Sequence, residues 1–346
     1  MKNIAFIVHG QTFLKSMGTL IYFANEVGIC PHIIVIKERQ NKLYDNIKLD
    51  TFKKLLQNTK HYKFYLIDSF DHIQDLLKKQ KIKFVVGQDM QHHSKNLCND
   101  QFKSFSIGSF FDTLHYAIDC KNKTIAKPYK IFYSSLLFKT EFERLMNDTW
   151  NSGVCGSPQL DHSLFINKEK PLTESVVFLT PTQNLISQNT QESLENFIEY
   201  CINNKIKFIM KDRQKSKWQF KNNNIENKII KISNEEGFPY TSLSLILNTN
   251  ISITSFGTSA YESQFFGKPV MNMDVINDNQ LSININSIKN IFNVTHIFNN
   301  NLSKTLTNNF IDTYEQMKNI TGNPKRILTM KDNFSLDILN DIVSDL

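Results

Sequence analysis

IAFIVHGQTFLKSMGTLIYFANEVGICPHIIVI, residues 4–36, contains the alternation that decides the fold. An apolar run of strand length, Ile4–Val8, precedes a stretch with helical spacing of apolar residues from Phe13 to Glu26, which Gly28 ends. A second apolar run follows at His32–Ile36. Strands that are apolar on both faces and alternate with helices are typical of a parallel sheet covered on both sides. The segment therefore predicts a β-α-β unit.

The same alternation continues along the chain and restarts once. Before the restart, strands are predicted at Tyr62–Ile67, Lys83–Gly87, Phe105–Ile107 and Lys130–Tyr133, with helices at Asp71–Lys79 and Ser135–Asn147. After it, strands are predicted at Ser175–Leu179, Lys207–Met210, Lys228–Ile232, Ile251–Thr254 and Lys268–Met273, with helices at Gln191–Asn203, Tyr240–Asn248 and Ala260–Phe266. Between them, Gly153–Pro158 is dense in glycine and proline, which indicates a break and a linker within Gly156–Pro171. The sequence thus predicts an α/β fold of two Rossmann-like domains with parallel sheets facing a central cleft.

Length and composition agree with this division and exclude some classes of function. A chain of 346 residues has room for two domains of about 100–200 residues each. The net charge of +7 suits an anionic ligand, but the basic residues form no dense run, so we expect no nucleic-acid partner. Five cysteines without a Cys-x-x-Cys pair indicate a reducing compartment. Because no apolar stretch reaches about 18 residues, we expect a cytoplasmic protein.

Polar residues gather where the strands of the second half end, and ligands of open α/β sheets bind at such carboxyl ends. Ser255, Gly257, Thr258 and Ser259 lie between a strand and a helix, where backbone N–H groups can approach a phosphate. Glu262 is expected in the first turn of that helix, within reach of a ribose diol. Helix capping alone would also account for the serine and threonine residues.

Two basic residues are candidates for the same phosphate site. Lys211 and Arg213 end the strand that we expect beside the phosphate turn, close enough to share one anion. A solvated turn that continues into further lysines is the alternative explanation.

The first half offers candidates for a general base. Asp112 and His115 would lie on one side of a short helix, and His9 directly follows the first strand. Deprotonation of a hydroxyl group needs a base, which Asp or His supplies. Each residue taken singly is also explained by capping or partial burial.

Several motifs are absent from the sequence. It contains no G-x-G-x-x-G and no G-x-x-x-x-G-K-[ST], so the dinucleotide and P-loop classes lack their fingerprints. No Asp-x-Asp occurs and no cysteine or histidine spacing fits zinc, so we expect no metal.

The unit from Ile253 to Glu262, followed by Gly267-Lys268-Pro269, resembles the donor-binding segment of the GT-B superfamily. There a Gly/Ser/Thr-rich turn precedes a helix with a Glu, and a "gkP" tripeptide opens the next strand. Gly156-Ser-Pro158-Gln-Leu-Asp161 is similar to the G-x-P-x-x-D of UDP-GlcNAc 2-epimerases and CDP-glycerol glycerophosphotransferases. Lys130–Ser135 is similar to the strand that precedes that motif in those families. Related enzymes often have "KpHP" where this chain has Lys-Asp-Arg at 211–213, so a histidine contact is missing.

The resemblance implies an acceptor domain at 1–158, a nucleotide-sugar domain at 172–326 and a helix at 327–346 that packs back on the first domain. It implies a metal-independent glycosyltransferase without a cofactor, with a UDP, CMP or CDP sugar as donor. The acceptor would be a glycan or lipid-linked precursor of a surface polysaccharide or glycolipid, used in the cytoplasm or at the inner membrane surface. A UDP-GlcNAc 2-epimerase, a CDP-glycerol-type phosphotransferase and a non-catalytic binding protein remain alternatives.

Overall fold

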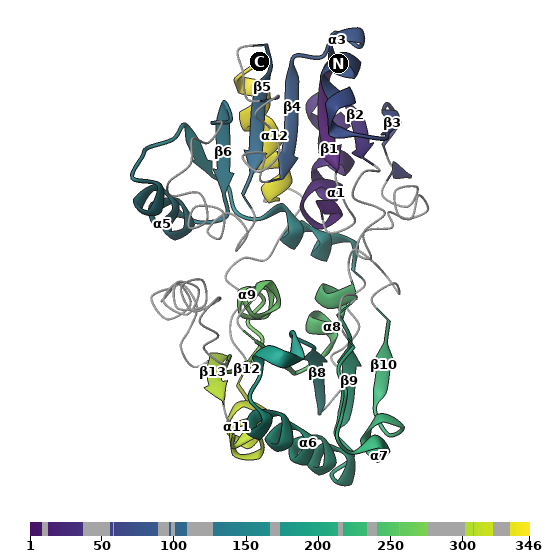
Figure 1. Cartoon of the computed structure of the whole chain (residues 1–346), viewed down its shortest axis with the longest axis vertical. Helices are drawn as coiled ribbons and strands as arrows, with labels where there is room; N and C mark the ends of the chain where they lie inside the picture. The colour runs from purple at the N-terminus through teal and green to yellow at the C-terminus, as the bar shows by residue number, and fades with distance from the viewer. Residues whose placement is uncertain are drawn as a thin grey trace. The chain divides into compact units, whose positions relative to one another are not determined.

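The computed structural model describes residues 1–8, 13–36, 56–57, 59–88, 97, 101–108, 127–166, 174–213, 217–233, 241–255, 257–275, 302–306, 308–320 and 333–346. The chain divides into two compact units, Met1–Leu164 together with Leu328–Leu346, and Phe165–Ile327 (Figure 1). Each unit is built around one parallel sheet.

The sheet of the first unit has the order β3-β2-β1-β4-β5-β6-β7 among the described residues. Its strands are β1 (Lys2–Val8), β2 (Ile29–Ile36), β3 (Lys63–Ile67), β4 (Phe84–Gln88), β5 (Lys103–Ile107), β6 (Lys130–Tyr133) and β7 (Ser152–Val154). The helical segments are α1 (Leu14–Phe23), η2 (Ala24–Val27), η3 (Phe70–His72), α3 (Ile73–Lys79), α5 (Leu136–Met146), η5 (Pro158–Phe165) and α12 (Phe334–Ser344). All pairs between neighbouring strands are parallel.

The sheet of the second unit has the order β10-β9-β8-β11-β12-β13. Its strands are β8 (Ser175–Leu179), β9 (Lys207–Lys211), β10 (Ile230–Ile232), β11 (Ile251–Ser255), β12 (Val270–Met273) and β13 (Ser303–Leu306). The helical segments are η6 (Gln183–Leu185), α6 (Gln188–Asn203), α7 (Asn223–Glu226), α8 (Thr241–Asn248), α9 (Thr258–Phe265) and α11 (Phe310–Met317).

Both sheets share one topology, which has a functional consequence. The chain moves outward from the first strand through two neighbours and then returns to pair a fourth strand on the other side. The strand order therefore reverses between β1 and β4 in the first unit and between β8 and β11 in the second. Such a switch point is where open α/β sheets bind ligands, outside the carboxyl ends of the strands.

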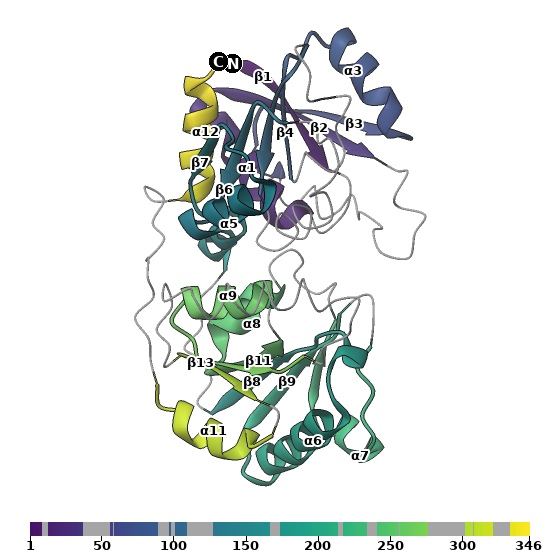
Figure 2. The same cartoon turned by 60° about the vertical axis from the view of Figure 1, so that its left-hand side comes forward.

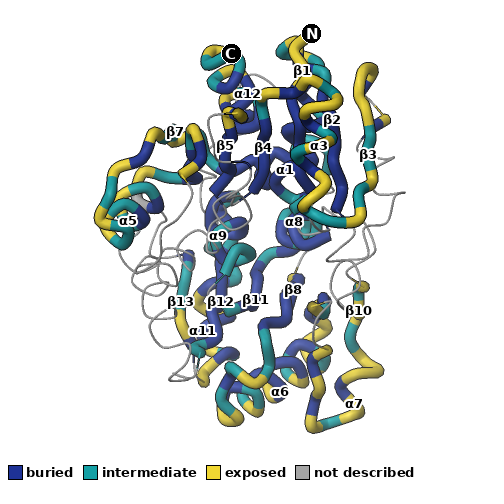
Figure 3. The backbone as a smooth tube through the Cα atoms, turned by 45° about the horizontal axis from the view of Figure 1, so that its top comes forward, coloured by how far each residue is buried: buried dark blue, intermediate teal, exposed yellow. Residues whose placement is uncertain are grey.

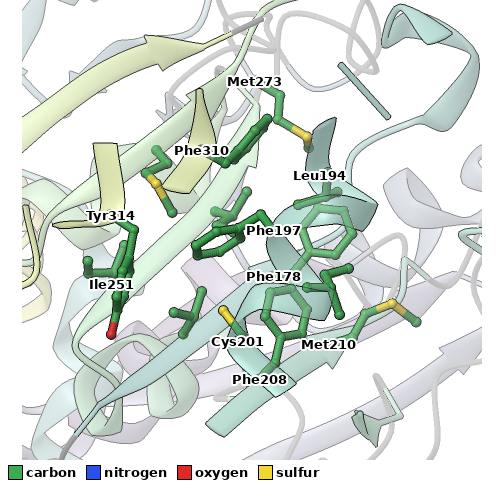
Figure 4. Packing of buried hydrophobic residues seen from close by; sticks show 14 of the residues in the cluster. Phe178, Leu194, Phe197, Cys201, Phe208, Met210, Ile251, Met273, Phe310 and Tyr314 are labelled. Carbon is green, nitrogen blue, oxygen red and sulfur yellow. The ribbon is translucent and has the colours of Figure 1, made fainter. Parts of the chain in front are cut away.

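Helices cover both faces of the second sheet, as expected for a sheet in which the strand β8 has apolar residues on both faces (Figure 2). Val176 and Phe178 pack into a large cluster with residues of α6 and α11, which Figure 4 shows from close by. Val177 and Leu179 point to the opposite face, where they meet Ile246 of α8. Successive residues of one strand thus belong to two cores, which explains why the strand reads as a continuous apolar run (Figure 3).

The C-terminal helix α12 packs against α1 and η2 of the first unit (Figure 1). Its N-terminus is held by the buried carboxylate of Asp161, which accepts the N–H groups of Phe334 at 3.1 Å and Ser335 at 2.7 Å. The Ser335 hydroxyl lies 2.6 Å from that carboxylate and 2.9 Å from the hydroxyl of Thr19 in α1, which donates to the carbonyl of Pro158. We call Thr19, Pro158, Asp161 and Ser335 the clasp.

Among the described residues, the structure departs from the sequence predictions at several elements. Ser152–Val154 forms the edge strand β7, so the break predicted over Gly153–Pro158 is wrong at its start. The strand β13, the helices α7 and α11 and the segment η5 were not predicted at all. Both missed strands are three or four residues long and contain serine, lysine, threonine or glycine, so neither carries the apolar run that identified the central strands.

Candidate functional site

The carboxyl end of β8, at the switch point of the second sheet, carries two threonines. Thr180 and Thr182 follow β8 directly, and β11 pairs with β8 on one side while β9 pairs with it on the other. The Thr180 N–H donates to the carbonyl of Lys211 at 3.1 Å, so the ends of β8 and β9 remain together beyond the strands.

Arg213 is fixed to both threonines. Its backbone N–H donates to the Thr180 hydroxyl at 2.9 Å, and its guanidinium Nη1 donates to the Thr182 hydroxyl. The residue is nevertheless exposed, whereas Lys211 at the end of β9 is 8% exposed. A guanidinium has five donors, so one bond to Thr182 leaves donors that can meet an anion.

The helix α9 begins at the end of β11, directly beside the switch point. Gly257 is its N-cap residue, with an extended backbone and no side-chain cap, and its carbonyl accepts the N–H groups of Ala260 and Tyr261. Ser255, Gly257, Thr258 and Ser259 are all half-buried. The first turn contains no acidic residue, so the positive end of the helix dipole is not compensated there by a carboxylate of the helix.

We expected Lys211 and Arg213 to end a strand directly beside the turn before α9, and this expectation is wrong. β9 does not pair with β11, because β8 lies between them. Two strand spacings separate the ends of β9 and β11 by about 10 Å. The bond from Arg213 to Thr182 spans one of those spacings, because it carries the guanidinium to the loop that follows β8.

The expected position of Glu262 is also wrong. Glu262 is the fifth residue of α9, beyond the first turn, and it is 4% exposed. It follows Thr258 by four residues, so the two side chains share one face of the helix.

Loops on either side of β11 meet beyond its end. Ile186, after β8, forms an antiparallel bridge with Val275, after β12. The β8 loop is fixed from the other direction by Gln183, whose amide donates to the carbonyl of Gln219 at 2.7 Å and accepts the N–H of Gln219 at 2.8 Å. The loop that carries Thr180 and Thr182 is therefore held on both sides.

Sequence reasoning placed Thr180 and Thr182 at the end of a strand but assigned neither of them a role. The signal was present, since two hydroxyl residues follow the first apolar strand of the second half. In contrast, the proposed bases His9, Asp112 and His115 lie outside the described residues. In the described part of the chain, no three His, Cys, Asp or Glu side chains come together as metal ligands.

Comparison with solved structures relates the whole chain to proteins of one architecture. The UDP-GlcNAc 2-epimerase of Methanocaldococcus jannaschii is 14% identical with a TM-score of 0.66, over 99% of this chain and 100% of that one. The UDP-GlcNAc 2-epimerase of Neisseria meningitidis, bound to UDP-GlcNAc, is 13% identical with a TM-score of 0.58, over 99% and 100%. UGT2 of Phytolacca americana, complexed with UDP-2-fluoro-glucose and pterostilbene, is 9% identical with a TM-score of 0.55, over 100% and 99%.

The chain has the GT-B fold. This confirms the resemblance and the α/β class of two parallel sheets that the sequence predicted. No family model and no curated protein sequence matches the chain. Among its described helices, none has the length and apolar character needed to cross a membrane.

Two of the motifs that carried the GT-B resemblance have structural roles here. Asp161 of the G-x-P-x-x-D motif holds α12. Lys268 of the Gly-Lys-Pro motif precedes β12, at the opposite end of the sheet from the switch point. Its ammonium donates to the carbonyl of Thr249 just after α8 at 2.8 Å, and burial lowers the pKa of this lysine. Lys268 therefore does not lie at the carboxyl ends of the strands of the second sheet.

Proposed function

We propose that the chain is a nucleotide-sugar enzyme and that the switch point of the second sheet binds the diphosphate of the donor. The observation that carries this proposal is the pairing of Arg213 with Thr182 beside the start of α9. A cationic side chain and the N-terminus of a helix then border the same end of the sheet. An anion at a helix N-terminus is stabilised by free N–H groups and by the helix dipole.

The diphosphate would span from α9 to Arg213. The turn of Ser255, Gly257, Thr258 and Ser259 would contact one phosphate, and Arg213 with Lys211 would contact the other. The Arg213 guanidinium reaches the loop after β8, one strand spacing of about 5 Å from the end of β11, so the two phosphates of a diphosphate can meet both contacts. A guanidinium that binds the diphosphate would also stabilise the charge on the leaving group as the sugar departs.

Glu262 would bind the ribose of the same nucleotide. It lies one helical turn beyond Thr258 on the same face of α9, so a ribose would reach it when the phosphates occupy the helix start. The corrected position, beyond the first turn, gives the carboxylate a deeper place than the phosphate contacts have.

The proposed reaction is transfer of the sugar to a hydroxyl acceptor. A base, for which Asp112, His115 and His9 are the candidates, would take the acceptor proton as the hydroxyl oxygen attacks the anomeric carbon. The bond to the diphosphate oxygen would break, and the nucleotide diphosphate would leave with the bonding electrons. UDP is the first nucleotide to test, because the solved structures named above are UDP-GlcNAc 2-epimerases or contain a UDP sugar.

A 2-epimerase is the second candidate function. The two epimerases have TM-scores of 0.66 and 0.58 with this chain, against 0.55 for UGT2. An epimerase would invert carbon 2 of the sugar of a UDP sugar without any acceptor.

The first experiment titrates the full chain with UDP, CDP, CMP and GDP in a calorimeter. Binding of one of these nucleotides supports the nucleotide site, and binding of none contradicts the proposed function. The second experiment incubates the chain with the matching sugar nucleotide and no acceptor, and follows the sugar by NMR. A new 2-epimer identifies an epimerase, whereas nucleotide release that depends on an added glycan or lipid-linked acceptor identifies a transferase.

A further inference from the structure

Lysines mark the amino edge of the first sheet. β1, β3, β5 and β6 begin with Lys2, Lys63, Lys103 and Lys130, and Lys83 immediately precedes β4. Because all these strands are parallel, their starts lie along one edge of the sheet. The row of lysines is therefore a feature of the fold, although the residues are scattered in the sequence.

Hydrogen bonds hold the segments of this edge together. The Lys103 N–H donates to the carbonyl of Lys83 at 2.8 Å, and the Lys2 N–H donates to the carbonyl of Gly28 at 2.9 Å. The Asn25 side chain accepts the N–H of His61 at 3.0 Å and donates to its carbonyl at 2.9 Å. These bonds fix the segment before β3 beside the start of β2.

The two halves of the edge differ in charge compensation. On the half near β5 and β6, Lys103 donates to the Asp345 carbonyl and Lys130 pairs with the carboxylates of Asp341 and Asp345, all at the end of α12. The other half, which comprises the starts of β3 and β4 and the end of α3, has six exposed lysines that form no ion pair within the described part of the chain. We call them the lysine edge: Lys60, Lys63, Lys78, Lys79, Lys81 and Lys83.

We propose that the lysine edge docks this protein on an anionic lipid bilayer. Clusters of four to eight basic residues on one surface are attracted to acidic lipid headgroups. Tyr62, which is 44% exposed, lies between Lys60 and Lys63, and tyrosine favours the interface between headgroups and acyl chains. The docked edge is the amino edge of its sheet, so the carboxyl ends of the same strands face away from the bilayer.

The residue type favours lipid over nucleic acid. All six residues are lysines, and the described part of the first unit contains one arginine, Arg144, which pairs with Glu141 on α5. Arginine is the residue for bidentate recognition of individual phosphates, whereas lysine acts as a point charge. A diffuse layer of negative headgroups needs only point charges spread over a surface.

The test measures co-sedimentation of the full chain with vesicles. Vesicles of phosphatidylcholine alone are compared with vesicles that contain about one third phosphatidylglycerol, in salt raised from about 0.1 M to about 0.5 M. The patch variant is Lys78→Gln/Lys79→Gln/Lys83→Gln. The control variant, Lys205→Gln/Lys207→Gln/Lys228→Gln, removes the same charge from exposed lysines of the second unit.

We expect the unchanged protein to bind only the anionic vesicles and to dissociate as salt rises. Each lysine near an anionic surface contributes about fivefold in binding, so the patch variant, which lacks three of them, should bind about a hundredfold more weakly. The control variant should bind within about twofold of the unchanged protein. Equal losses in both variants, or no vesicle binding at all, would overturn the proposal. Binding to a DNA duplex is measured in the same buffers. A patch variant that loses binding to the duplex but retains binding to the vesicles would also overturn the proposal.

Discussion

The clasp and the switch point of the second sheet are both polar, but their polar groups have opposite surroundings. In the clasp, Asp161 is 0% exposed and its carboxylate accepts hydrogen bonds from the backbone of α12. At the switch point, Arg213 is exposed and the first residues of α9 are half-buried. A polar cluster that satisfies itself stabilises the fold, whereas one that keeps donors at the surface can bind a ligand.

The largest expected loss of stability comes from replacing Asp161, which tests whether the clasp stabilises the fold. Asp161→Ala leaves the N–H groups of Phe334 and Ser335 without their acceptor in a buried position. The free energy of unfolding should fall by about 3–5 kcal/mol in urea titrations. Asp75→Ala, which removes an exposed carboxylate from the first turn of α3, should cost below about 1 kcal/mol. Equal costs for the two variants would mean that Asp161 does not hold α12.

Gly156 lies against the first residue of α12, so its replacement is a second test of the packing around the clasp. Gly156 has φ +82°, and a Cβ there would lie 2.1 Å from the Phe334 ring, whereas Gly28 has φ +77° and open space. Gly28→Ala therefore tests the backbone conformation alone, with an expected cost of about 1 kcal/mol. Gly156→Ala adds a steric overlap and should cost about 3 kcal/mol in the same unfolding measurement. If both variants lose the same stability, the contact between Gly156 and Phe334 is not tight.

A pH effect next to the clasp comes from His162. Burial lowers the pKa of His162 to about 4, and one ring nitrogen lies 2.8 Å from the carbonyl of Lys15. In the unfolded chain this histidine gains a proton near pH 6.5, but in the folded chain it stays neutral until about pH 4. Its contribution is therefore fully present above pH 6.5 and is lost as the pH falls toward 4.

Unfolding titrations at about pH 7 and about pH 4.5 measure this contribution. The unchanged protein should lose about 2 kcal/mol more stability between the two pH values than His162→Gln, which has no titrating group at that position. If the free energy of unfolding depends on pH identically in both proteins, His162 is already protonated in the folded state at about pH 4.5, and its pKa is not lowered.

Sequence patterns predicted the central strands well because both faces of those strands are buried. β2 and β8 contain the continuous apolar runs Ile33–Ile36 and Val176–Leu179, and each strand lies in the interior of its sheet. The edge strands β7 and β13 have partly exposed residues, so their composition does not differ from that of a loop. The order of the strands determines which strand ends lie next to each other at the candidate site. The position of β8 between β9 and β11 results from pairing between segments that are distant in the sequence, and patterns of residue type do not reveal such pairing.

The sequence motifs also predicted the fold better than the candidate site. The patterns at Gly156–Asp161 and Gly267–Pro269 helped to predict the fold, which was correct, but their residues hold helices and loops in place. The sequence assigned no role to Thr182, because its contact with Arg213 joins residues that are 31 positions apart in the chain.

The central claim, that the switch point of the second sheet binds a nucleotide diphosphate, is tested most directly at Arg213. Calorimetric titration with the nucleotide that binds the unchanged protein should give a dissociation constant about ten to a hundred times higher for Arg213→Ala, because a charged hydrogen bond contributes about 1.5–3 kcal/mol. Arg144→Ala, which removes an exposed arginine of α5, should leave that constant unchanged, and both variants should unfold within about 0.5 kcal/mol of the original. A dissociation constant for Arg213→Ala within about twofold of that of the unchanged protein would contradict the account.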